Sequence, residues 1–179
     1  MKFAGLLNTI AITTMVGIGA YHIQDAQAQQ VVLNVSAEDK RCLQENIFWE
    51  ARDQSTLGQA AVAWVTINRM EDTKYPNTIC AVVKQGRKNP DGSMIRHKCQ
   101  FSWYCDGKSD KIPNNVVAQR AWENAGIVAE VVLYDWAKGK SSPVQNSIMY
   151  HADYVTPKWS KSYSRVVKID DHIFYKTSL

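Results

Sequence analysis

Glu50 is the residue whose placement in the sequence most directly suggests chemistry. On a helix that turns by about 100° per residue, Glu50 shares a stripe with Leu43 and Ile47, whereas Glu45 points to the opposite side. A carboxylate on an apolar helix face is partly desolvated, and desolvation raises its pKa. A carboxylic acid that stays protonated near neutral pH can donate a proton to a leaving oxygen, which is the task of a general acid in glycoside cleavage.

A structural role for Glu50 is the alternative interpretation. From periodicity alone, we favour a buried ion pair in which Arg52 or Arg69 neutralises the carboxylate. The choice between an acid and an ion-pair partner therefore depends on the sequence around Glu50.

The elements that must position Glu50 are helices in the first part of the chain. We expect helices over 37–54, 57–71, 78–85 and 115–138, the first capped by Ser36 and the third ended by Gly86. Residues 87–98 form a basic, turn-rich segment that contains Asn89-Pro90-Asp91-Gly92, and residues 100–104 are expected on or beside a strand.

Short strands are expected near the end of the chain, over 147–150, 164–169 and 172–176, with a turn at Asp170-Asp171. Helices followed by short antiparallel strands indicate an α+β class, and 179 residues suffice for one compact domain. The composition, 45% hydrophobic and 21% charged, is that of a globular protein and excludes bulk disorder.

The net charge of +4 suits an anionic polymer or surface without identifying one. The basic residues of 84–98 match no nucleic-acid-binding motif, so we expect no nucleic-acid partner.

The N-terminus resembles an export signal. Lys2 precedes an apolar stretch over 3–23, and Ala26-Gln27-Ala28 fits the small-x-small pattern of a signal peptidase site. We interpret residues 1–28 as a secretory signal or a releasable signal anchor, with possible transient association of 3–23 with the inner membrane. Residues 29–36 are then a linker, residues 37–179 form the catalytic domain, and either interpretation places that domain in the periplasm or cell wall.

Four cysteines follow the signal: Cys42, Cys80, Cys99 and Cys105. An even number in an exported domain indicates two disulfides, with three possible pairings. Cys99 and Cys105 could close a small loop, and Cys42 and Cys80 would then tie the first helix to a later segment. A zinc site is the alternative, but the spacing fits no common ligand pattern, so we expect no metal.

An ordered series of short blocks runs through the chain. The blocks are Phe48-Trp49-Glu50-Ala51-Arg52, Gly58-Gln59-Ala60-Ala61-Val62-Ala63, Asn68-Arg69, Tyr75-Pro76-Asn77-Thr78, Val82-Val83-Lys84-Gln85, Cys99-Gln100-Phe101-Ser102-Trp103, Tyr150 to Trp159, and His172-Ile173-Phe174-Tyr175-Lys176. The series resembles the SleB/CwlJ-type cell wall hydrolases, which include spore cortex-lytic enzymes and phage relatives. The resemblance covers about residues 42–176.

The resemblance implies a lysozyme-like α+β domain that cleaves the MurNAc–GlcNAc β-1,4 bond of peptidoglycan, with Glu50 as the catalytic acid and no cofactor. One block departs from the family pattern, because Asp53-Gln54 stands where Gly-Glu is usual. The second Glu is therefore missing, and the helical angle of Asp53 points away from Glu50.

With a single Glu, the expected reaction is lytic transglycosylation, which forms a 1,6-anhydro product without water. Hydrolysis by a muramidase that uses the same Glu is the alternative, and it usually needs a second carboxylate, for which Asp106 and Asp153 are the candidates. The chain would then be a phage endolysin or a host autolysin, and the sequence leaves this open.

Glycan grooves commonly combine aromatic platforms with polar side chains. The candidate substrate-binding residues are Gln100, Ser102, Trp103, Tyr150, His151, Asp153, Tyr154, Trp159 and Tyr175. Core packing is the alternative for each aromatic residue, and it is what we expect for Trp64, Trp122 and Trp136.

Two other functions remain as alternatives to glycan cleavage. A metalloamidase could use His97, His151 and His172 as ligands, but no close histidine pair of the H-E-x-x-H kind occurs. A wall-binding module without activity would leave Glu50 structural. In every case we expect a monomer whose partner is peptidoglycan.

Overall fold

The structure is a computed structural model that describes residues 22–32 and 34–178. Most of the proposed signal or anchor, residues 1–21, lies outside the described residues. Residues 22–32 are helical, so the segment expected as a linker from residue 29 begins inside a helix. Among the described residues, no helix combines the length and apolar character needed to cross a bilayer.

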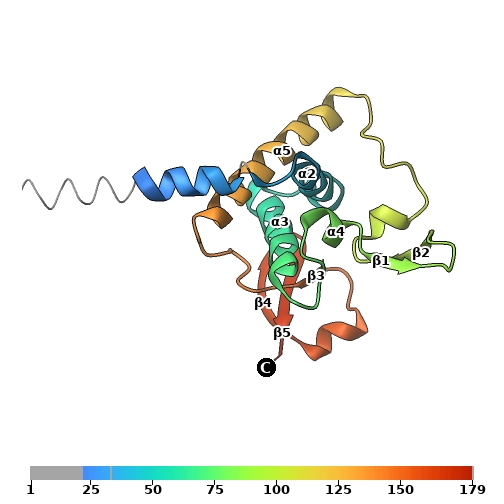
Figure 1. The fold of residues 1–179 in the computed structure, drawn as a ribbon. Helices are drawn as coiled ribbons and strands as arrows, with labels where there is room; N and C mark the ends of the chain where they lie inside the picture. Colours follow the sequence, from blue (N-terminus) through green and yellow to red (C-terminus); the bar gives the residue numbers. More distant parts are fainter. Residues whose placement is uncertain (1–21, 33, 179) are drawn as a thin grey trace, which may run out of the picture.

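Four helices form the larger part of the domain: α2 (Ala37–Ala51), α3 (Thr56–Glu71), α4 (Ile79–Val83) and α5 (Val116–Ala137). Each begins at a side-chain cap, and the caps are Ser36, Ser55, Thr78 and Asn115. Helix α2 packs against the other three and lies among them (Figure 1). The predicted helices are confirmed, with ends that differ by a few residues.

A three-stranded antiparallel sheet follows the helices. Its strands are β3 (Met149–Ala152), β4 (Tyr163–Ile169) and β5 (His172–Thr177), in the order β3-β5-β4. Tyr150 pairs with Phe174 in the register of β3 and β5, and a short 3-10 helix, η2 (Lys158–Ser162), leads into β4. All three predicted strands are confirmed, as is the turn at Asp170-Asp171.

A second, two-stranded sheet corrects the prediction for residues 87–98. Strands β1 (Gly86–Lys88) and β2 (Met94–Cys99) form an antiparallel hairpin, with the predicted turn between them. Residues 100–104 lie beside a strand, as expected, because they directly follow β2, and Ser102–Cys105 form a 3-10 helix, η1. The short strands carry basic rather than alternating apolar residues, so periodicity could not reveal them.

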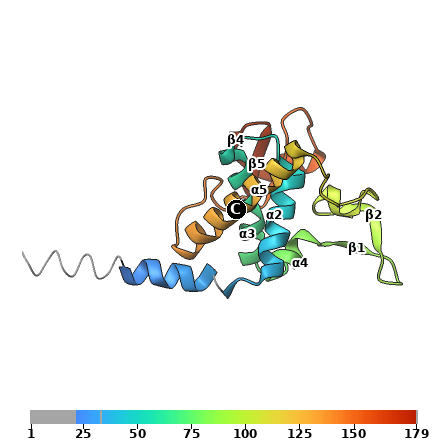
Figure 2. The same cartoon turned by 90° about the horizontal axis from the view of Figure 1, so that it is seen from above.

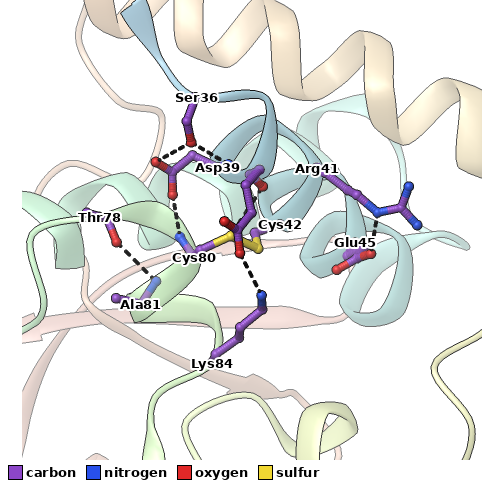
Figure 3. Close-up of polar contacts among 10 residues, drawn as sticks. Ser36, Asp39, Arg41, Cys42, Glu45, Thr78, Cys80, Ala81 and Lys84 are labelled. Atoms are coloured by element: carbon purple, nitrogen blue, oxygen red, sulfur yellow. Dashed lines mark hydrogen bonds and ion pairs between the residues drawn. A yellow bond between two sulfur atoms is a disulfide. The ribbon is translucent and has the colours of Figure 1, made fainter.

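The two disulfides pair in the way that sequence proximity suggested. Cys42 of α2 is bonded to Cys80 of α4, with 5.2 Å between their Cα atoms (Figure 3). Cys99 and Cys105 close the loop between β2 and η1, with Cα atoms 6.0 Å apart. At the first disulfide, the Cys80 backbone N–H donates to Asp39 Oδ1 at 2.7 Å, so a carboxylate of α2 caps α4.

The core lies between α2, α3, α4 and α5, and Leu43, Ile47 and Phe48 of α2 are fully buried in it. Three buried polar side chains of the core are linked by hydrogen bonds. Asn46 donates to the Thr66 hydroxyl at 3.1 Å and accepts from Trp103 Nε1 at 3.0 Å. These hydrogen bonds fix the segment after β2 against α2, close to the end where Glu50 lies.

Candidate functional site

Glu50 and Tyr150 meet between the helices and the three-stranded sheet. Glu50 is the second-last residue of α2, and Tyr150 is the second residue of β3. The Tyr150 hydroxyl donates a hydrogen bond of 2.9 Å to Glu50 Oε2, across 100 positions of sequence. Glu50 is half-buried as a residue and is not sealed within the core.

The surroundings of Glu50 favour its protonated form. Desolvation by burial raises the pKa of Glu50, and this effect outweighs the Tyr150 hydrogen bond and the charge of Arg69, which both lower it. Burial also raises the pKa of Tyr150 well above its usual value, so its hydroxyl keeps its proton at neutral pH. The expectation from helix periodicity, a desolvated carboxyl on an apolar face, agrees with this environment.

Arg69 lies near Glu50 without pairing with it. Its Nε donates to the Ile148 carbonyl oxygen at 2.8 Å, and its guanidinium lies over the rings of Phe101 (4.9 Å) and Tyr75 (5.6 Å). One guanidinium nitrogen, Nη1, is buried and has no hydrogen-bond partner in the described part of the chain. Arg69 therefore supplies positive charge at a distance.

Arg52 is also not a partner of Glu50. It is exposed, and its guanidinium lies over the rings of Phe48 (5.0 Å) and Trp49 (5.2 Å). Among the described ion pairs, none joins Glu50 to an arginine. The buried ion pair that periodicity favoured is therefore wrong.

Trp103 has a supporting role in the structure. It is 9% exposed, its ring stacks on Trp49 with 6.3 Å between centroids, and its Nε1 donates to Asn46. Because Trp49 directly precedes Glu50, this stack fixes the end of α2. Trp103 lies near the site, but as part of the core beneath it and not as an open platform.

Three candidate residues gather on the other face of the sheet. Successive residues of a strand point to opposite faces, so His151 faces away from Tyr150. His151 Nε2 lies 2.9 Å from the Tyr175 hydroxyl, the two rings stack at 5.2 Å, and Trp159 contacts both edge-on at 5.5 Å. The structure brings His151, Tyr175 and Trp159 together as one aromatic cluster, and it does not bring them to Glu50.

The remaining candidates show no contact with Glu50 in the described residues. Gln100 and Ser102 are exposed, and Tyr154 is 84% exposed. Asp153 is paired with Lys168 at 2.6 Å, and this pairing lowers the pKa of Asp153. Asp106 lies 3.9 Å from Lys108.

Gln54, which occupies the place of the family's second Glu, binds the β4–β5 turn. Its amide donates to Asp171 Oδ2 and accepts from the Asp171 backbone N–H, both at 3.2 Å. The neighbouring Ser55 donates to Asp170 Oδ2 through its backbone N–H (2.9 Å) and its hydroxyl (2.6 Å). These contacts join the end of α2 to the sheet and so help hold Glu50 opposite Tyr150.

Tyr75 and Phe101 were not among the predicted site residues, although both contact Arg69. Burial raises the pKa of Tyr75, and the Arg69 charge opposes that rise. The available signal is the Tyr75-Pro76-Asn77-Thr78 block, which is one of the blocks that carry the family resemblance. Pro76 turns the chain after α3, and Tyr75, which precedes it, contacts Arg69.

The histidines proposed as metal ligands do not meet in the described residues. His97 is exposed on β2, whereas His151 and His172 belong to opposite faces of the sheet. The one described group with metal-ligating atoms close together is Glu38, Cys42 and Cys80, and the two sulfurs of that group are joined in a disulfide.

Two polar cavities lie away from Glu50. They measure about 460 and 410 Å³, and both are lined by Asn68, Glu71 and Asn146 at the C-terminal end of α3. Glu50 lines neither of these two cavities.

The chain is similar in sequence to known spore cortex-lytic enzymes. Spore cortex-lytic enzymes of Bacillus cereus and Bacillus subtilis (strain 168) are 28% and 24% identical to it, over 142 and 152 residues. These matches cover 79% and 84% of this chain but 45% and 42% of the relatives, so the chain spans less than half the length of these proteins.

Two solved structures share the fold. The catalytic domain of the germination-specific lytic transglycosylase SleB from Bacillus anthracis is 26% identical, with a TM-score of 0.54 over 80% of this chain and 98% of that domain. The catalytic domain of the Bacillus cereus SleB protein is 27% identical, with a TM-score of 0.50 over 80% and 94%. These similarities confirm the predicted lysozyme-like α+β class.

The cell wall hydrolase family model matches residues 53–175, which begin three positions after Glu50. The match includes Tyr150, Arg69 and both small sheets. Together with the shared fold, it shows that the chain belongs to the cell wall hydrolase family.

Proposed function

We propose that this protein cleaves peptidoglycan glycan strands at the MurNAc–GlcNAc β-1,4 bond as a lytic transglycosylase, with Glu50 as its single catalytic carboxyl group. The observation that carries the proposal is the environment of Glu50, a carboxyl group whose pKa is raised by burial and which is oriented by Tyr150. Such a group is suited to donate a proton near neutral pH.

The reaction uses Glu50 twice. The protonated carboxyl donates its proton to the glycosidic oxygen as the C1–O bond of MurNAc breaks and positive charge develops at C1. The resulting carboxylate then accepts the proton of the MurNAc C6 hydroxyl while O6 bonds to C1. The products are a 1,6-anhydro-MurNAc end and a free GlcNAc hydroxyl, and Glu50 is protonated again.

The candidates for a second carboxylate are poorly suited to activate a water, which favours transglycosylation over hydrolysis. Within the described part of the chain, the side chain that hydrogen-bonds to Glu50 is Tyr150 and not a second carboxyl group. Asp153 and Asp106 lie beside lysines, and Gln54 replaces the second Glu. A water-activating carboxylate opposite Glu50 is therefore not evident in the described residues.

The substrate is proposed from the family and from the named activity of the B. anthracis SleB catalytic domain. An extracytoplasmic location is consistent with it, because peptidoglycan lies outside the inner membrane and two disulfides form readily in an oxidising compartment.

The test is digestion of purified peptidoglycan by the wild type and by Glu50→Gln, with products identified by mass spectrometry. Gln is nearly isosteric and can still accept the Tyr150 hydrogen bond, but it cannot donate the acid proton. Anhydro-muropeptides from the wild type alone would support the proposal. Reducing-end products lost in the variant would instead indicate a muramidase, freed stem peptides an amidase, and binding without turnover a wall-binding module.

A further inference from the structure

The β1–β2 hairpin, residues 86–99, holds most of the protein's net charge. It carries four cationic side chains and the carboxylate of Asp91, a net charge of +3 in 14 residues, whereas the whole chain carries +4. The cations are Arg87, Lys88, Arg96 and Lys98. The other 165 residues are therefore close to neutral.

These cations are available for an external partner. All four are exposed, and no ion pair among the described residues engages them. Asp91, the hairpin's own carboxylate, accepts hydrogen bonds from the Ser93 backbone N–H and hydroxyl in the turn. The hairpin projects from the helical body in both views (Figures 1 and 2), so its charge is presented to solvent.

Arg96 is fixed in place while its neighbours are not. Its Nε donates to the Asp106 carbonyl oxygen at 2.8 Å. A side chain at Gly107, whose φ is 82°, would come within 2.9 Å of that nitrogen. This contact and the Cys99–Cys105 disulfide brace the base of the hairpin, whereas Arg87, Lys88 and Lys98 are exposed and form no ion pair within the described residues.

The base of the hairpin is continuous with the site. The Gln100 backbone N–H donates to the Gln85 carbonyl oxygen at 2.9 Å, Phe101 then lies under Arg69, and Trp103 stacks on Trp49 beside Glu50. A six-residue strand spans roughly 20 Å. The hairpin thus places four exposed cations on a segment that is joined directly to the surroundings of Glu50.

We propose that the β1–β2 hairpin binds the carboxylates of peptidoglycan stem peptides while the glycan lies at Glu50. This inference rests on the proposed function, because it names the part of the same polymer that the hairpin contacts. The sugar chain offers few charges, whereas the stems that branch from it bear free carboxylates. Exposed cations near such stems add affinity that depends on salt concentration.

The hairpin is less suited to a membrane surface. Segments that bind in a lipid interface expose apolar side chains that enter it, next to the cations. In the hairpin, the large apolar side chains, Met94 and Ile95, are half-buried, and apart from Pro90 and Gly92 in the turn the exposed residues are charged or polar. The observations therefore favour an anionic polymer in solution or in the wall.

The test compares two triple variants, both made in the inactive Glu50→Gln protein. The hairpin variant is Arg87→Gln, Lys88→Gln and Lys98→Gln. The control variant carries Lys140→Gln, Lys161→Gln and Arg165→Gln, which remove the same charge from exposed positions outside the hairpin.

Binding is measured by titration calorimetry with soluble glycan strands that retain their stems, and with the same strands after an amidase has removed the stems. Both preparations are first freed of phosphate-containing wall polymers. We expect the hairpin variant to bind stem-bearing strands roughly tenfold more weakly than the control variant, with no difference on stripped strands. Raising the salt concentration should remove most of the difference.

Three results would overturn the inference. The first is equal affinity of the two variants for stem-bearing strands, and the second is an equally large loss of affinity of the hairpin variant for stripped strands. The third is that the protein binds phosphatidylglycerol vesicles through the hairpin while showing no preference for strands that carry stems. The proposed function fails separately, if the wild type releases no glycan fragments. Circular dichroism of both variants confirms that the comparison is between folded proteins.

Discussion

At the scale of single residues, the protonation of Glu50 is set by opposing influences. Desolvation holds the proton on the carboxyl group, and the Tyr150 hydroxyl and the Arg69 charge favour its release. Because a buried hydrogen bond to a charged acceptor is stronger than a neutral one, Tyr150 controls both the orientation and the acidity of Glu50. Tyr150 itself stays protonated, so its role is to donate a hydrogen bond.

Tyr150→Phe separates these two roles. Removing the hydroxyl should raise the pKa of Glu50 further, so the alkaline limb of the kcat/KM profile moves to higher pH, by about one unit for a hydrogen bond of typical strength. The maximal rate should fall because the carboxyl group is less well oriented. A pH–rate profile of the variant checks this, and an alkaline limb at the wild-type position would contradict the assigned contact.

At the scale of elements, the site depends on how the connection between α2 and α3 joins the three-stranded sheet. Gln54 and Ser55, between α2 and α3, bind the Asp170-Asp171 turn between β4 and β5. Gly58, in the first turn of α3, allows this approach, because a Cβ there would overlap Asp170 Oδ2 and come within 3.0 Å of Gln54 Cβ.

Gly58→Ala should therefore destabilise the protein, although Ala is normally better than Gly inside a helix. We expect a loss of about 1–3 kcal/mol in the free energy of unfolding, since the Asp170 carboxylate is held by two hydrogen bonds from Ser55 and cannot move without breaking them. Urea unfolding measures this change. Gly126→Ala is the control, because its Cβ meets the flexible end of Gln44, and a gain in stability at both positions would refute the argument.

The two disulfides should contribute unequally. The Cys42–Cys80 bond closes 38 residues and the Cys99–Cys105 bond closes 6. The chain-entropy relation then gives about 4 kcal/mol for the first and about 2 kcal/mol for the second. Paired Cys→Ala variants, unfolded in urea, should show the larger loss for Cys42 and Cys80. The reverse order would mean that the short loop near the hairpin matters more than chain entropy predicts.

At the scale of the whole molecule, the site lowers the stability of the fold at neutral pH. The folded protein raises the pKa of Glu50 above its unfolded value, so folding is favoured most at pH values below the unfolded pKa. As the pH rises from there through the folded pKa, the unfolded state loses its proton first and stability falls. Above both the unfolded and the folded pKa, the ionised and desolvated carboxylate of Glu50 still destabilises the folded state.

Glu50→Gln should remove that cost. The variant is expected to melt at a higher temperature than the wild type near pH 7, by on the order of 2–4 °C for each kcal/mol relieved. The difference should disappear at acid pH, where the wild type is also neutral at this position. Thermal unfolding across pH measures this, and a difference that grows toward acid pH would contradict the sign.

The sequence predicted the helices, the three strands of the larger sheet and the desolvated position of Glu50, because each depends on local periodicity or capping; the catalytic role of Glu50 stays a prediction. It did not predict the β1–β2 hairpin, whose strands are too short and too basic to show a period of two. It also grouped Tyr150 with His151, Trp159 and Tyr175, although neighbouring strand residues face opposite ways. The ion pair with Arg69 was wrong because Ile148, Phe101 and Tyr75 hold that side chain, and their contacts arise only in the tertiary fold.

The contact between Glu50 and Tyr150 spans 100 positions, and the turn that braces it lies some twenty residues further on. During synthesis, a ribosome finishes α2 long before it reaches β3, so the nascent chain carries Glu50 without the hydroxyl that orients it. The same holds for a fragment cut before residue 150. The geometry that we propose for the reaction is therefore completed only when the three-stranded sheet has followed the helices out of the ribosome.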